Sequence, residues 1–79
     1  MDAVIQKIQD LMGRIETAVK NNYNGFTEEF QKQIDTALAK GQEAIDLAKK
    51  GEIVEAAEVG AEAVGELTVV AGELGLAAA

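Results

Sequence analysis

The residues of this chain that could carry chemistry are mainly carboxylates, and three of them share one face of a predicted helix. Glu55, Glu58 and Glu62 are three and four residues apart, which places their side chains next to one another on a helix. Such a row could gather a hard cation such as Ca²⁺ or Mg²⁺. No adjacent loop supplies carbonyl ligands, however, and a run of charge on a helix usually faces water. We interpret the row as a solvated acidic face.

Catalysis needs a nucleophile, a base or an acid in a suitable setting, and the chain offers few of these. It contains no histidine, cysteine or serine, which removes the commonest general base and two common nucleophiles. The remaining Asp, Glu, Lys, Tyr and Thr residues fall into no arrangement that would tune them for acid–base work, and no glycine-rich phosphate loop is present. We therefore expect a protein that is not an enzyme and that uses no metal or cofactor.

The length limits the chain to one small helical domain, residues 1–79. A core of this size gives marginal stability, so short proteins commonly rely on disulfides, a metal ion or association. Because cysteine and histidine are absent, association is the device that remains. The expected partners are copies of the chain itself.

Charge is distributed unevenly along the chain, whose formal net charge is −7. Residues 1–50 hold eight acidic and seven basic residues, whereas residues 51–79 hold six glutamates and no basic residue. This balance is unsuited to nucleic acid, whose phosphates attract Lys and Arg, and to an anionic membrane surface. No membrane span is expected, because the longest nearly apolar run, residues 67–79, is short and contains Glu73.

Apolar residues recur at helical spacing in three segments, which predicts an all-α protein with three amphipathic helices at about residues 3–20, 27–50 and 52–76. The stripe of the first segment contains Ile5, Ile8, Met12, Ile15 and Val19, widened by Val4, Leu11 and Ala18. That of the second contains Phe30, Ile34, Leu38, Gly41, Ile45 and Ala48, supported by Ala37 and Ala44. That of the third contains Ile53, Ala57, Gly60, Val64, Leu67, Ala71, Leu74 and Ala78. The first stripe has the width of a core-facing helix, and the third has the most regular spacing.

The segment boundaries carry helix start and stop signals. Thr27 is a suitable N-cap for the second helix, and Glu28 and Glu29 follow where the helix dipole favours negative charge. Two lysines and then Gly51 form a stop signal at its other end. The third stripe resumes at Ile53, one position out of phase with the second. This favours a tight turn and an αα-hairpin over one long, kinked rod.

Glycines at positions 60, 65, 72 and 75 are an unusual feature of the third segment. A glycine inside a helix costs roughly 1 kcal/mol relative to alanine, so a compensating contact is expected. Close approach of another helix is such a contact, and small residues recur at four-residue intervals, as helix–helix packing requires. For positions 72 and 75, a loose chain end is the alternative explanation. Outer positions also change from glutamate to apolar residues along the segment, which indicates burial by other subunits.

We therefore predict a structural subunit that self-assembles into a homo-oligomer or a helical filament through close packing of its third helix. The expected contact residues are Ala57, Gly60, Ala61, Val64, Gly65, Leu67, Val69, Ala71, Gly72, Leu74, Gly75 and Leu76. The expected electrostatic contacts join Glu55, Glu58, Glu62 and Glu66 of one copy to basic residues such as Lys7, Arg14, Lys32 and Lys40 of another. Such pairs would make the assembly sensitive to salt.

Two other functions fit parts of the same pattern. A small acidic binding module, or adaptor, could present its third helix to a basic or groove-bearing protein. A helix lying on a lipid surface is disfavoured, because such helices carry Lys and Arg on the polar face whereas this one carries glutamate. The sequence indicates no particular cellular location.

Overall fold

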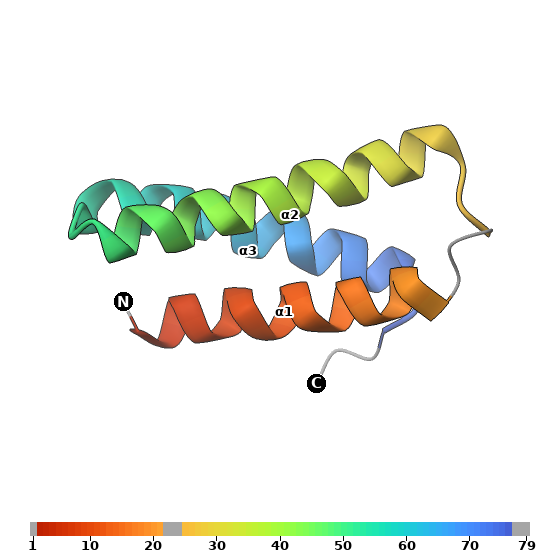
Figure 1. Ribbon diagram of the computed structural model, residues 1–79, viewed down its shortest axis with the longest axis horizontal. Helices are drawn as coiled ribbons and strands as arrows, with labels where there is room; N and C mark the ends of the chain where they lie inside the picture. The colour runs from red at the N-terminus through yellow and green to blue at the C-terminus, as the bar shows by residue number, and fades with distance from the viewer. Residues whose placement is uncertain (1, 22–24, 77–79) are drawn as a thin grey trace.

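The computed structural model describes residues 2–21 and 25–76 of the chain and is all-helical over these ranges, which confirms the predicted fold class at that level. Helix α1 spans Asp2–Asn21, α2 spans Glu28–Lys49 and α3 spans Ile53–Glu73. The described ranges contain no strand. The helices form one compact bundle in which α3 contacts both α1 and α2, and its contact with α2 is the more extensive (Figure 1).

The predicted core stripes of α1 and α2 face the interior. Ile8 and Ile15 of α1 are fully buried, and Met12 packs against them at the edge of the core. The buried residues of α2 are Ile34, Ala37, Gly41, Ala44 and Ile45. Over the described residues this core contains no polar or charged side chain. Removal of aliphatic surface from water is therefore the main force that holds the helices together.

At Gly41 of α2, side chains of both other helices lie close to the backbone. A Cβ atom at this position would lie 2.7 Å from Met12 Sδ, 3.2 Å from Ile8 Cγ2 and 3.3 Å from Leu67 Cδ1. The first two atoms belong to α1 and the third to α3. The residue was predicted to lie on the apolar stripe of its helix, and the structure adds a reason for glycine there, because a Cβ atom would crowd side chains of α1 and α3.

Helix α2 begins at the predicted cap. The Thr27 hydroxyl accepts a hydrogen bond of 3.1 Å from the backbone N–H of Phe30, which satisfies one of the donors left unpaired at a helix start. The rings of Phe26 and Phe30 meet edge to face, with their centroids 5.4 Å apart. This aromatic contact joins the residue before the cap to the first turn of the helix.

Helix α2 ends in a glycine stop, as its sequence predicts. Gly51 has a φ of +81°, a region that L side chains adopt at a cost. Its N–H donates to the carbonyl of Ala48, and the N–H of Glu52 donates to the carbonyl of Leu47. These two bonds form a Schellman motif, which pairs the last carbonyls of the helix and redirects the chain. Helix α3 starts directly afterwards at Ile53.

Helix α3 ends in a second stop of the same kind, earlier than residue 76. Gly75 has a φ of +77°, and its N–H donates to the carbonyl of Gly72. The N–H of Leu76 donates to the carbonyl of Ala71, which completes the motif. The helix itself finishes at Glu73. Glycine at position 75 therefore stops the helix and does not lie within it.

Helix α3 is turned about its axis relative to the predicted stripe. Its buried residues are Ala56, Gly60, Ala63, Leu67, Val70 and Ala71. Ile53 and Ala57 of the predicted stripe are exposed, and Ala78 lies outside the described residues. Most positions of α3 other than the glutamates are apolar or glycine, so more than one stripe fits the sequence. The orientation adopted buries Leu67 and Val70, which remove more apolar surface from water than alanine does.

Candidate self-association surface

Three members of the predicted contact set are buried within the chain itself, namely Gly60, Leu67 and Ala71. A Cβ atom on Gly60 would lie 3.2 Å from Val4 Cγ1 and 3.7 Å from Ile8 Cδ1, both on α1. The close helix approach expected at Gly60 is therefore made inside one chain. These three residues belong to the core of the folded chain and not to its surface, so a second copy cannot reach them.

The rest of the predicted set is divided between the edge of the core and the surface. Val64, Leu74 and Leu76 are half-buried and pack against the core. Gly75 is exposed, but its helix-stop role explains the glycine without a partner. The exposed residues that remain are Ala57, Ala61, Gly65, Val69 and Gly72. They follow one another at intervals of four, four, four and three residues, so they share one side of the helix, which we call the outer face of α3.

The two glycines of the outer face differ from the two buried ones. Cβ atoms built on Gly65 and Gly72 would meet nothing within 4 Å, apart from the local helix backbone. At Gly41 and Gly60, by contrast, side chains from other helices lie at 3.2 Å or less. Packing inside the chain therefore explains the buried glycines of α2 and α3, and it leaves Gly65 and Gly72 without an explanation.

The large apolar residues that are exposed in the described part of the chain all belong to α3. Their exposed fractions are 52% for Ile53, 74% for Val54 and 54% for Val69. Ile53 and Val54 are adjacent in the first turn, and we call this pair the α3 corner. The sequence pattern places Ile53 on the apolar stripe of the third helix and does not include Val54. The available signal was that Val54 lies off the predicted stripe, in an acidic segment where water exposure is expected.

A groove that is lined in part by Val69 lies between α2 and α3. Its volume is about 430 Å³, and we call it the α2–α3 groove. The residues that line it are Glu29, Lys32, Gln33, Thr36, Gly65, Glu66, Val69 and Val70. Val69 and Gly65 therefore belong to both the outer face and the groove, while charged side chains surround them. Five of the eight lining residues are polar or charged, and Val69 is the exposed large apolar residue among them.

The predicted electrostatic residues are on the surface, and two of them pair within the chain. Lys40 Nζ lies 3.7 Å from Glu62 Oε1, which joins α2 to α3. An exposed pair of this kind contributes about 0–1 kcal/mol. Glu55 and Glu58 are exposed, and no group of acidic side chains in the described ranges is arranged to hold a metal ion. Glu66 is half-buried, and both it and Lys32 line the α2–α3 groove.

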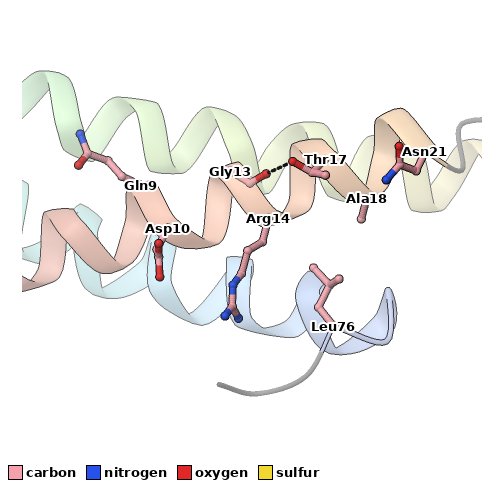
Figure 2. Close-up of a pocket in the computed structure, with 8 residues that line it drawn as sticks. All are labelled: Gln9, Asp10, Gly13, Arg14, Thr17, Ala18, Asn21 and Leu76. Atoms are coloured by element: carbon pink, nitrogen blue, oxygen red, sulfur yellow. Dashed lines mark hydrogen bonds between the residues drawn. The ribbon is translucent and has the colours of Figure 1, made fainter.

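A second hollow lies between α1 and the end of α3. Figure 2 shows Arg14 extending from α1 toward α3, with Leu76 beside it. The Thr17 hydroxyl donates a hydrogen bond of 2.9 Å to the Gly13 carbonyl, so this hydroxyl is paired within its own helix. A neighbouring hollow on the same side is lined by Lys7, Arg14 and Gly72. Two of the predicted basic contact residues thus lie near the Gly72 end of the outer face.

No family model, no curated protein and no solved structure matches the chain. Among the described residues, no helix is both long and apolar enough to cross a membrane.

Proposed function

We propose that this protein is a structural subunit that associates with copies of itself through the exposed side of α3. One observation carries the proposal. The exposed large apolar residues of the described chain are on α3, and two helix glycines with open space above them lie on the same helix. Exposed apolar surface of this kind is typical of contact sites, and a missing side chain permits close approach.

The free energy of the glycines supports this proposal. Each glycine within a helix costs roughly 1 kcal/mol relative to alanine, so Gly65 and Gly72 together cost about 2 kcal/mol. A domain of this size has a total stability of about 4–12 kcal/mol. The two glycines therefore remove a substantial part of it. Contact with another copy would compensate for this loss of stability, whereas no contact within the isolated chain does so.

We further infer that α2 and α3 act as one αα-hairpin, which presents the outer face of α3. Two features support the inference: the glycine stop at Gly51, directly before α3, and the extensive contact between the two helices. The ribbon in Figure 1 turns back at this point. A hairpin of this kind would hold the α2–α3 groove in a fixed shape.

The substitution Gly65→Leu tests the proposed function. The added side chain meets open space in the single chain, so we expect the monomer to fold and to gain up to about 1 kcal/mol of helix stability. The same side chain would block close approach of another copy, and the mass measured by light scattering should fall toward that of the monomer.

Gly13→Leu is the matched control for that experiment. Gly13 also lies within a helix, is exposed, and has nothing within 4 Å of an added Cβ atom, but it lies on α1. This variant should assemble like the unmodified protein. An unchanged mass for Gly65→Leu would contradict the proposal, as would an equal loss of mass for both variants.

A second candidate function is an acidic binding module for a basic partner. It is favoured by the exposure of Glu55 and Glu58 on a helix that contains no basic residue. Under this alternative the protein alone would be monomeric at all concentrations. It would bind a lysine-rich peptide with an affinity that falls as salt is raised.

A further inference from the structure

We draw no further inference here: the strongest candidate, the outer face of α3 with the open space at Gly65 and Gly72 and the exposed side chain of Val69, belongs to the surface already proposed for self-association, and nothing in the described part of the chain shows what covers it.

Discussion

Gly41 and Gly13 both lie inside helices, but only Gly41 has close neighbours where a side chain would begin. A Cβ atom on Gly41 would meet α1 and α3 at 2.7–3.3 Å. One on Gly13 would meet nothing within 4 Å. The same residue type therefore contributes to packing at one position and lowers stability at the other.

Alanine substitutions at these two glycines should change stability in opposite directions. Gly13→Ala should raise the free energy of unfolding by up to about 1 kcal/mol, because alanine favours the helix. Gly41→Ala should lower it, since overpacking costs about 1–3 kcal/mol and outweighs that gain. Urea denaturation followed by circular dichroism measures both values. A stabilised Gly41→Ala variant would contradict the packing described for the three helices.

Sequence periodicity predicts inward-facing residues well where apolar and polar residues differ strongly. The stripes of α1 and α2 meet this condition, and Ile8, Ile15 and Ile34 are fully buried as expected. Helix α3 does not meet it, because alanine, glycine and valine occupy most of its sides. The sequence left the rotation of α3 open, and contact with α1 and α2 decides it in favour of burying Val70 in place of Ala57.

At the scale of elements, local signals define the helix ends. Thr27 caps α2 and Gly51 stops it, as their residue types predict, because a cap needs only a neighbouring N–H and a stop needs only a positive φ. Gly75 carries the same signal at the end of α3, but it stands in a segment with several other glycines. Its role could not be separated from theirs without the structure.

The glycine stop between α2 and α3 gives a prediction for the turn. Gly51→Ala should lower the free energy of unfolding by about 1–2 kcal/mol, because a side chain at positive φ is strained. Gly51→Asn should lose less, since asparagine tolerates this region better. Thermal unfolding of the three proteins gives the order glycine, asparagine, alanine. Equal stability for all three would contradict the Schellman motif at this turn.

At the scale of the whole molecule, the predicted contact set combined two kinds of residue. Gly60, Leu67 and Ala71 hold the chain together, while Gly65 and Val69 remain available to another copy. Sequence pattern could not separate them, because small residues serve close packing equally well within a chain and between chains. The sequence pattern could not predict the α2–α3 groove either, because residues of two separate helices form it.

The mass of the unmodified protein in solution tests the central claim most directly. Light scattering should be measured on purified protein over a wide range of concentrations at low salt. We predict a mass that exceeds the 8.3 kDa of one chain and rises with concentration, because α3 exposes surface that a second copy can cover. A mass of 8.3 kDa at every concentration would contradict the account.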